Sequence, residues 1–373
     1  MNQPDHSNRR EFIRGRSTMR ALQDLAETVI GDTPATSTQH PGQATSRAEA
    51  CLAEISRRAM ACEFQILWDM DRYGPATDTA LEALDLVAQL ESQLSVYQPS
   101  SEVSQLNQHA GQRPIPVEPG LFHLLEQCKT LHEQTAGCFD ITSNPLSRLW
   151  GFHRRQGELP EPTHIDETRR QVGSQWLELD PDQQTVHFTN SDLEINLGSI
   201  GKGYALDRCG ELFQDTDIQN YIIHGGMSSI LAAGSRYPAR GDEPGWWIAL
   251  RHPLKPEKRL AEIRLQDGAL GTSGSANQFF YHQGKRFGHV LDPRSGHPAD
   301  GVLSATVLAP TAALADALAT AFFVMGPEEA FQYCDAHPPL AALFVLPGPR
   351  QGSHEIQTWG LPAGSWKPSE LND

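Results

Sequence analysis

Residues 301–327, GVLSATVLAPTAALADALATAFFVMGP, form the most informative stretch of this chain, and they contain a single charged residue, Asp316. The alanine- and leucine-rich run predicts a buried helix that begins near Thr311. On that helix Asp316 and Thr320, four residues apart, would share one face. A lone carboxylate among apolar side chains is costly to bury unless it is paired or bound to a metal. We therefore look for chemistry at this helix.

A histidine and a second carboxylate precede the helix in the segment His289-Val-Leu-Asp292-Pro293-Arg-Ser-Gly296. A single histidine is usually structural, but turn residues surround this one, and loops often carry reactive side chains. Asp316 and Thr320 offer hard oxygen ligands, of the kind that Mg2+ combines with phosphates and water. The alternative is an aspartate that the helix dipole favours in the first turn. We favour the metal, because Asp316 lies well inside the apolar run.

Two glycine-containing segments are candidate anion sites. Gly198-Ser-Ile-Gly201-Lys202-Gly203 follows a predicted strand and opens a predicted helix, whose N-terminal N–H groups favour an anion. It is not a P-loop, because Gly203 stands where Ser or Thr should follow the lysine. Lys202 is either a phosphate contact, which we favour, or a solvated side chain in a structural turn. Gly271-Thr272-Ser273-Gly274 predicts a tight turn whose hydroxyls contact phosphate or metal, or a turn with no further role.

Composition excludes several classes of protein. The chain has 373 residues, 39% of them hydrophobic, and a formal net charge of -16, which disfavours binding to nucleic acid. Its longest apolar run, around residues 312–325, is too short to cross a bilayer, so no transmembrane span is expected. The six cysteines include no C-x-x-C pair, which argues against a zinc ribbon.

The N-terminal residues suggest two localisations. Arg9-Arg10 lies in a segment that resembles a twin-arginine export motif, but residues 17–30 carry charges where an apolar region should follow. The protein is exported to the periplasmic side if this motif works as a signal, and is otherwise cytoplasmic. Residues 33–46, rich in Thr, Ser, Pro and Gln, indicate a linker. The expected organisation is a flexible leader and linker over 1–50, one domain over 51–350 and a C-terminal tail over 351–373.

The remaining elements mix helices and strands without regular βαβ alternation, so the expected fold class is α+β. Period-2 and buried apolar runs predict strands at 61–68, 193–197, 220–223, 246–250, 261–265 and 341–346, and a hairpin over 176–188 that turns at Pro181-Asp182. Period-3.6 patterns predict helices at 77–94 and 121–131, and another from Gly203 through Leu212.

Taken in order, segments from about Ala59 to Ala342 resemble the FAD:protein FMN transferase family, often called ApbE-type flavin transferases. The order and spacing of the segments make the resemblance specific. The segments that carry it are Met60-Ala-Cys-Glu-Phe, Leu94-Ser-Val-Tyr97, Ser101-Glu-Val-Ser-Gln-Leu-Asn107, Gly137-Cys-Phe139-Asp140-Ile-Thr142, Leu149-Trp150-Gly151-Phe152, Asn196-Leu-Gly-Ser199-Ile-Gly-Lys202-Gly203-Tyr204-Ala-Leu-Asp207, Gly225-Gly226, Thr272-Ser273-Gly274, His289-Val-Leu-Asp292-Pro293 with Gly296, and Ala315-Asp316-Ala-Leu-Ala-Thr320.

The resemblance implies an α+β protein that binds FAD between two halves of one domain. With Mg2+ it would move the FMN moiety to a threonine (or serine) hydroxyl of an acceptor flavoprotein and release AMP. By position, the metal would meet Asp316, Thr320 and an oxygen near Ser199, taken as its backbone carbonyl. His289, with Asp316, would be catalytic. The implied FAD contacts, to which we add Ser273, are Met60, Tyr97, Phe139, Asp140, Asn196, Lys202 and the backbone near Leu291.

Asn196 departs from the family pattern, which usually has aspartate there; the amide keeps an acceptor oxygen but loses the charge. Two other functions stay open. With water in place of the acceptor hydroxyl, the same site would be an FAD pyrophosphatase that yields FMN and AMP. Without turnover, the protein would be an FAD-binding maturation factor.

Overall fold

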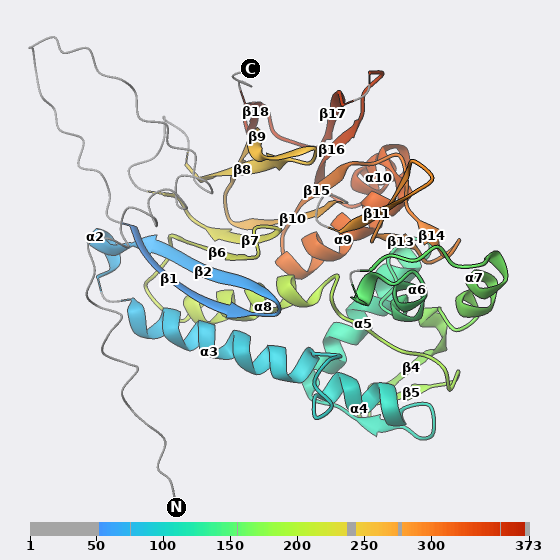
Figure 1. Cartoon of the computed structure of the whole chain (residues 1–373). Coiled ribbons are helices and arrows are strands. Elements are labelled where there is room, and N and C mark those ends of the chain that lie inside the picture. Colours follow the sequence, from blue (N-terminus) through green and yellow to red (C-terminus); the bar gives the residue numbers. More distant parts are fainter. Residues whose placement is uncertain are drawn as a thin grey trace, which may run out of the picture.

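The computed structural model describes residues 52–74, 76–154, 156–236, 244–274, 278–350 and 352–369 (Figure 1). The expected leader and linker over 1–50, with Arg9-Arg10, lie outside the described residues. Mixed helices and antiparallel sheets confirm the α+β class. Within the described residues no helix is both long and apolar enough to span a bilayer.

An antiparallel sheet of eight strands forms the centre of the fold. Its inner strands are buried on both faces, so they are almost continuously apolar, as in the AALFV run that begins at Ala341. In order across the sheet, the strands are β1 (Leu52–Ala59), β2 (Cys62–Asp69), β6 (Tyr221–Gly225), β7 (Ser229–Ala233), β10 (Gly268–Gly274), β15 (Ser304–Ala309), β16 (Ala341–Pro347) and β17 (His354–Trp359).

Different elements cover the two faces of this sheet. On one face lie the helices α3 (Thr77–Leu94), α8 (Gly201–Gln214) and α9 (Ala312–Met325). On the other lies a three-stranded sheet of β18 (Trp366–Pro368), β9 (Lys255–Leu265) and β8 (Trp246–His252). Because successive side chains of a strand point to opposite faces, Phe344 belongs to the helical core and Leu343 to the core between the sheets.

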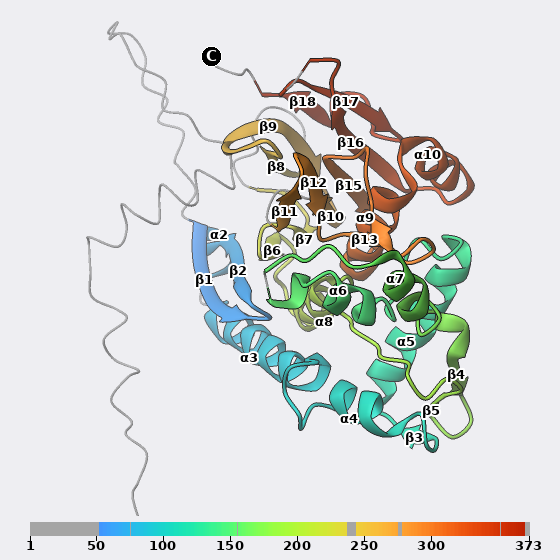
Figure 2. The same cartoon turned by 45° about the vertical axis from the view of Figure 1, so that its right-hand side comes forward.

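A second group of elements packs beside the central sheet (Figure 2). Together with the central sheet, it encloses the cleft described below. Its elements are α4 (Glu102–His109), α5 (Pro119–Gln134), α6 (Asn144–Leu149), η3 (Phe152–Arg154), α7 (Pro162–Arg169), η4 (Ser174–Trp176), the sheet of β3 (Ile115–Pro116), β5 (Thr185–Phe188) and β4 (Leu177–Asp180), and the hairpins β11 (Phe279–His282) with β12 (Lys285–Gly288) and β13 (Leu291–Asp292) with β14 (His297–Pro298). The short helix α2 (Met70–Tyr73) follows β2, and α10 (Pro327–Ala336) follows α9.

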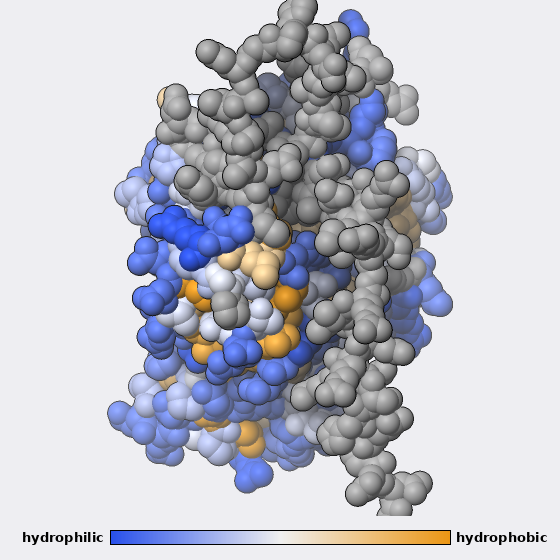
Figure 3. Space-filling model, turned by 90° about the vertical axis from the view of Figure 1, so that its left-hand side faces the viewer, coloured by the Kyte–Doolittle hydropathy of each residue, from blue (hydrophilic) through white to orange (hydrophobic). Residues whose placement is uncertain are grey.

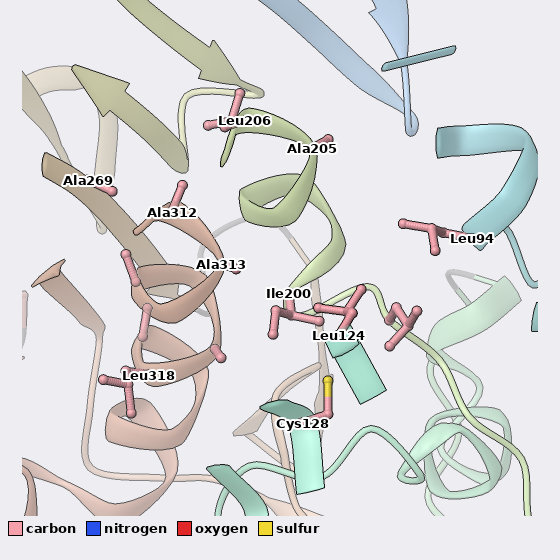
Figure 4. Packing of buried hydrophobic residues seen from close by; sticks show 14 of the residues in the cluster. Leu94, Leu124, Cys128, Ile200, Ala205, Leu206, Ala269, Ala312, Ala313 and Leu318 are labelled. Atoms are coloured by element: carbon pink, nitrogen blue, oxygen red, sulfur yellow. The ribbon is translucent and has the colours of Figure 1, made fainter. Parts of the chain in front are cut away.

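Helix α9 begins and ends where its sequence predicts. The Thr311 side chain caps its N-terminus by accepting a hydrogen bond from the Leu314 N–H at 3.4 Å. Gly326, with φ +80°, ends it. Between these residues the helix is buried on almost every side. Figure 4 shows Ala312 and Ala313 packed beside α8, which carries Ala205 and Leu206.

One face of the molecule shows how the surface is solvated. On the face turned to the viewer in Figure 3, the described residues are mostly hydrophilic, and hydrophobic ones are exposed only in small groups. The many polar and charged residues on this face keep it solvated.

Two expected elements are wrong. Residues 193–197 form no strand. The Asn107 side chain takes the place of a neighbouring strand: it accepts from the Ile195 N–H at 2.8 Å and donates to the Ile195 carbonyl at 2.9 Å. Gly271-Thr272-Ser273-Gly274 is no tight turn but the end of β10. The glycine at 271 has another cause: a Cβ there would lie 2.3 Å from the Ala315 carbonyl oxygen on α9.

The other predicted elements are confirmed closely, including the helix over Thr77–Leu94 and the hairpin of β4 and β5. The segment expected as a C-terminal tail contributes β17 and β18. The alternating sequence HEIQTW of β17 pairs with β16 as the edge strand of the central sheet.

Candidate active site

A cleft of about 890 Å³ lies between the C-terminal end of β10, the start of α8 and the second group of elements. It brings together residues far apart in the sequence, from Cys138 to Thr320. Of the predicted site residues, those that line it are Asp140, Asn196, Ser199, Lys202, Ser273, His289, Leu291, Asp316 and Thr320.

Asp316 is the buried carboxylate of this cleft, with 6% of its surface exposed. Its Oδ2 accepts hydrogen bonds from the Gly203 N–H and the Ser229 hydroxyl, each at 2.8 Å. The Lys202 ammonium lies 3.8 Å from the same oxygen. Burial raises the pKa of Asp316, and Lys202 with the two hydrogen bonds opposes that rise. A cation near Asp316 would therefore compensate a charge that burial disfavours.

Two contacts fix α9, which carries Asp316, against α8. The Gly203 N–H at the start of α8 donates to Asp316. One turn further along α8, both oxygens of Asp207 accept from the first N–H groups of α9, those of Ala312 and Ala313, at 2.7 and 2.8 Å. A carboxylate at a helix N-terminus satisfies N–H groups that have no partner within the helix. These contacts hold Asp316 and Lys202 in a fixed relation.

His289 presents one ring nitrogen to the cleft. Its Nδ1 donates to the Gln278 carbonyl at 3.2 Å, which leaves Nε2 as the nitrogen that accepts a proton in the neutral ring. Burial lowers the pKa of His289 below 6.5, and the bond to Gln278 only partly opposes this. The ring is therefore neutral at pH 7 and is chemically suited to act as a base.

Asp140 is a second buried carboxylate that lines the cleft. Its oxygens accept from the Thr142 hydroxyl at 2.7 Å and the Ser174 hydroxyl at 2.8 Å. The His132 Nδ1 lies 3.1 Å from Oδ2. Burial raises the pKa of Asp140, but the hydrogen bonds from His132 and Thr142 outweigh burial and leave it below 3.8. The hydrogen bond to Asp140 is the main cause that raises the pKa of His132 above 6.5.

We predict that His132→Gln destabilises the protein most near pH 5. The stabilisation from His132 is complete below pH 6.5 and is lost as the pH rises through its raised pKa. The stabilisation from Asp140 is complete above pH 3.8 and is lost as the pH falls through its lowered pKa. Urea unfolding at pH 5 should show a loss of about 1 to 3 kcal/mol, the value of a hydrogen bond to a charged group.

The matched control for that variant is His123→Gln, in the same helix α5. His123 also pairs with a carboxylate, Glu126, at 2.9 Å, but its side chain is 71% exposed. Exposed pairs contribute little to stability, so this variant should unfold like the wild type. Equal losses in the two variants, or a loss at His132 that does not shrink by pH 9, would contradict the account of the buried pair.

Asn196 has its own partners. Its Oδ1 accepts from the Gly198 N–H at 2.9 Å, and its Nδ2 donates to the Asn144 Oδ1 at 3.1 Å. Asn144 in turn donates to Glu194 at 3.1 Å. An aspartate at 196 would have no N–H to donate to Asn144. The amide N–H of Asn196, which the aspartate usual in the family would lack, therefore has an acceptor in the Asn144 Oδ1.

Three predicted FAD contacts do not line the cleft. Met60 lies in the left-handed turn between β1 and β2, at φ 49°, and its N–H donates to Glu91 at 2.8 Å. Tyr97 is 79% exposed, in the segment between α3 and α4. Phe139 is buried in the core, next to Asp140. These residues stay predictions of FAD binding.

The oxygen atoms at the cleft suit a hard cation. Asp316, Thr320 and Ser199 all line it, and the Thr320 hydroxyl lies 3.4 Å from the Asp316 carbonyl. The hydrogen bonds that described residues make to the Asp316 carboxylate are to Oδ2. Across the described ranges, no group of three or more His, Cys, Asp or Glu side chains is arranged to hold a metal. One carboxylate with other oxygens fits Mg2+, which retains waters and shares substrate phosphates.

The sequence did not reveal two supporting side chains. Ser229 donates to Asp316 from β7, 87 residues away in sequence. A serine that opens the apolar strand Ser229-Ile-Leu-Ala-Ala was a weak signal for such a role. His132, the partner of Asp140, carries no local signal, because it lies outside the apolar positions of α5, as the other polar residues of that helix do.

Comparison with known proteins places the chain in a family. The sequence profile of the ApbE family matches residues 60–344. The FAD:protein FMN transferase of Haemophilus influenzae is 29% identical over 302 residues, which cover 78% of this chain and 86% of that protein. The FAD:protein FMN transferase of Vibrio cholerae is 30% identical over 256 residues, 68% of this chain and 75% of that protein.

Solved structures agree with this placement. The ApbE protein of Thermotoga maritima superposes with a TM-score of 0.73 at 28% identity, covering 83% of this chain and 97% of that one. The flavin transferase ApbE of Vibrio cholerae superposes with a TM-score of 0.71 at 25% identity, covering 83% and 98%. The resemblance seen in the sequence is confirmed: this chain belongs to the ApbE family and is a transferase.

Proposed function

We propose that this protein transfers the FMN moiety of FAD to a threonine (or serine) hydroxyl of an acceptor flavoprotein, with Mg2+, and releases AMP. The relatives named FAD:protein FMN transferase support the flavin as the group transferred. The observation that carries the proposal is the buried Asp316, placed with Lys202 and Thr320 on a large polar cleft. Such a cleft suits a dinucleotide whose diphosphate needs cations and N–H donors.

In the proposed reaction the acceptor hydroxyl oxygen attacks the FMN-side phosphorus of FAD. A new phosphorus–oxygen bond forms, the bond from that phosphorus to the bridging oxygen breaks, and AMP leaves with that oxygen. His289 Nε2 accepts the hydroxyl proton. Lys202 and the N–H groups at the start of α8 hold the diphosphate charge, and positioning and charge neutralisation account for most of the catalysis.

The metal would be held by Asp316, Thr320 and the backbone oxygen of Ser199. When bound there, Mg2+ supplies neutralisation of the diphosphate charge. Without it, Asp316 repels the substrate, since the two are both negative. Buried hydrogen bonds from Ser229 and Gly203 keep the carboxylate oriented.

The test is to incubate the protein with FAD, Mg2+ and a candidate acceptor from the same genome. Mass spectrometry of the acceptor should show covalently added FMN, and chromatography should show an equal amount of AMP. Free FMN with an unmodified acceptor would identify an FAD pyrophosphatase instead. Bound FAD without AMP would identify a maturation factor that does not turn over.

We predict that His289→Asn lowers the rate of transfer about 10²- to 10⁴-fold, the usual contribution of a general base. Because burial lowers the pKa of His289, wild-type transfer should persist as the pH falls below 6.5 and be lost only when the ring gains a proton. Initial rates of AMP release between pH 5 and 9 measure both effects.

His337→Asn is the control, since the His337 Nδ1 also bonds a carbonyl, that of Tyr333, at 2.9 Å, but the residue does not line the cleft. This control variant should retain wild-type rates. A His289→Asn enzyme with an unchanged rate would remove His289 from the proposed chemistry.

A further inference from the structure

A second cavity, of about 190 Å³, lies on the other side of the central sheet, between that sheet and the layer of β8 and β9. One of its walls is polar and comes from the central sheet: His224 of β6, Thr272 of β10, and Ser304 and Thr306 of β15. The facing wall includes the apolar residues Ile248 and Leu260, with Arg251 and His252 of β8 also lining the cavity. An apolar cavity of about 150 Å³ already holds benzene, so a single five- or six-membered ring fits here.

Strand register explains why the polar side chains gather. Thr272 and Thr306 lie directly opposite each other on neighbouring strands, and their hydroxyls are 3.0 Å apart. Two residues earlier on β10, the same face carries Leu270, which belongs to the core between the sheets. The polar residues therefore occupy one end of an otherwise apolar face. That end is next to the active-site cleft.

His224 is the unusual member of this wall. It is 3% exposed, and neither of its ring nitrogens has a hydrogen-bond partner among the described residues. Buried polar atoms almost always have partners, so a ring with both nitrogens free calls for an occupant of the cavity. Burial lowers the pKa of His224 to about 4, so the ring is neutral at pH 7. A neutral imidazole offers one donor and one acceptor.

The cavity also adjoins the catalytic cleft. Ser228, Thr272 and Gly274 line both spaces. The Thr272 N–H donates to the Ser228 carbonyl at 2.8 Å, which ties the shared wall together. The two spaces thus adjoin along the end of β10, where Ser273, next to Thr272, lines only the cleft.

We propose that this cavity is a second binding site, which takes a small neutral carboxamide through His224. An amide matches this polar wall, because its N–H can donate to the accepting ring nitrogen of His224 and its oxygen can accept from a neighbouring hydroxyl such as that of Ser304. Ile248 and Leu260 suit the carbon skeleton of the amide, and the neutral His224 ring requires no charge on the ligand. The carboxamide comes either from a free molecule or from an Asn or Gln side chain of a polypeptide. The inference does not depend on the reaction proposed for the cleft.

The experiment titrates the full-length protein, with its histidine rings labelled with ¹⁵N, with 2-pyrrolidinone. Saturable shifts of the His224 ring signals are expected, and cyclopentanone, which has no N–H to donate to the accepting ring nitrogen, should bind about tenfold more weakly. N-acetylglutamine methylamide is the second probe. If it also binds, a polypeptide side chain reaches the cavity; if only the lactam binds, the source is a free molecule.

His224→Phe should weaken lactam binding about tenfold, whereas His337→Phe, away from the cavity, should leave it unchanged. If His224→Phe does not fold, Thr306→Val tests the same wall. A crystal of the wild type soaked in 2-pyrrolidinone gives the direct answer. Ordered water alone against both ring nitrogens, or equal shifts with cyclopentanone, would overturn the proposal.

Discussion

Asp316→Asn is expected to reduce the rate of FMN transfer about 10²- to 10³-fold, the loss typical of removing a principal electrostatic group from an active site. Asparagine keeps the size of the side chain but not its charge. Its amide oxygen can take the place of Oδ2, which accepts from both the Gly203 N–H and the Ser229 hydroxyl, so the substitution removes the charge and leaves these two acceptor contacts possible. Rates of AMP release over a range of Mg2+ concentrations measure the effect, and the proposed role predicts that added Mg2+ does not restore the rate.

The control for this substitution is Asp69→Asn. Asp69 is another buried aspartate, 3% exposed, which caps the short helix α2 far along the sequence from the cleft residues. Asparagine caps helices about as well as aspartate, so the control should fold and react like the wild type. An Asp316→Asn enzyme that folds and still transfers FMN at the wild-type rate would rule out the role assigned to the carboxylate.

Gly203→Ala is expected to destabilise the protein by about 3 kcal/mol, the upper part of the usual range for overpacking a core. A Cβ at 203 would lie 2.1 Å from the Ala312 carbonyl oxygen and 2.6 Å from the Ala313 nitrogen. These are backbone atoms at the start of α9, so no side-chain rotation relieves the clash. Helix α9 must move away from α8, and Asp316 moves with it.

Gly201→Ala, in the same helix, should have the opposite effect. The nearest atoms to a Cβ there, on Leu197 and Leu94, lie at 3.9 Å, which is ordinary contact. Alanine favours a helix over glycine by up to about 1 kcal/mol, so this variant should be as stable as the wild type or slightly more. Urea unfolding compares the two variants, and AMP release shows whether activity falls only in Gly203→Ala. Similar stabilities would show that α8 and α9 are not packed as closely as described.

The sequence predicted the parts of the fold that depend on local patterns. The helix over Thr77–Leu94 follows from its periodicity, and α9 follows from its alanine- and leucine-rich run and its cap at Thr311. The lone charge of α9 lines the cleft. Residues 193–197 were misassigned because their apolar side chains are buried in the core, as in a strand, while the Asn107 side chain, and not a neighbouring strand, bonds the backbone of Ile195. No local pattern distinguishes those two kinds of backbone partner.

Close packing between distant elements was equally hidden. Gly271 suggested a turn, but its neighbour is the backbone of Ala315, and a glycine in a strand gives no sign of which element approaches it. Ser229 and His132 were missed for the same reason. The partner of Ser229 is Asp316, 87 residues away on α9, and the partner of His132 is Asp140, in the segment that follows α5. Tertiary contacts, and not propensity, place these side chains.

The most direct test of the central claim is a crystal structure with FAD and Mn2+, whose anomalous signal locates the cation in place of Mg2+. One peak is expected at about 2.0 to 2.3 Å from the Asp316 carboxylate, with the Thr320 oxygen and the FAD diphosphate also in contact with the cation. A cation bound elsewhere, or FAD bound with its diphosphate away from Asp316, would contradict the central claim.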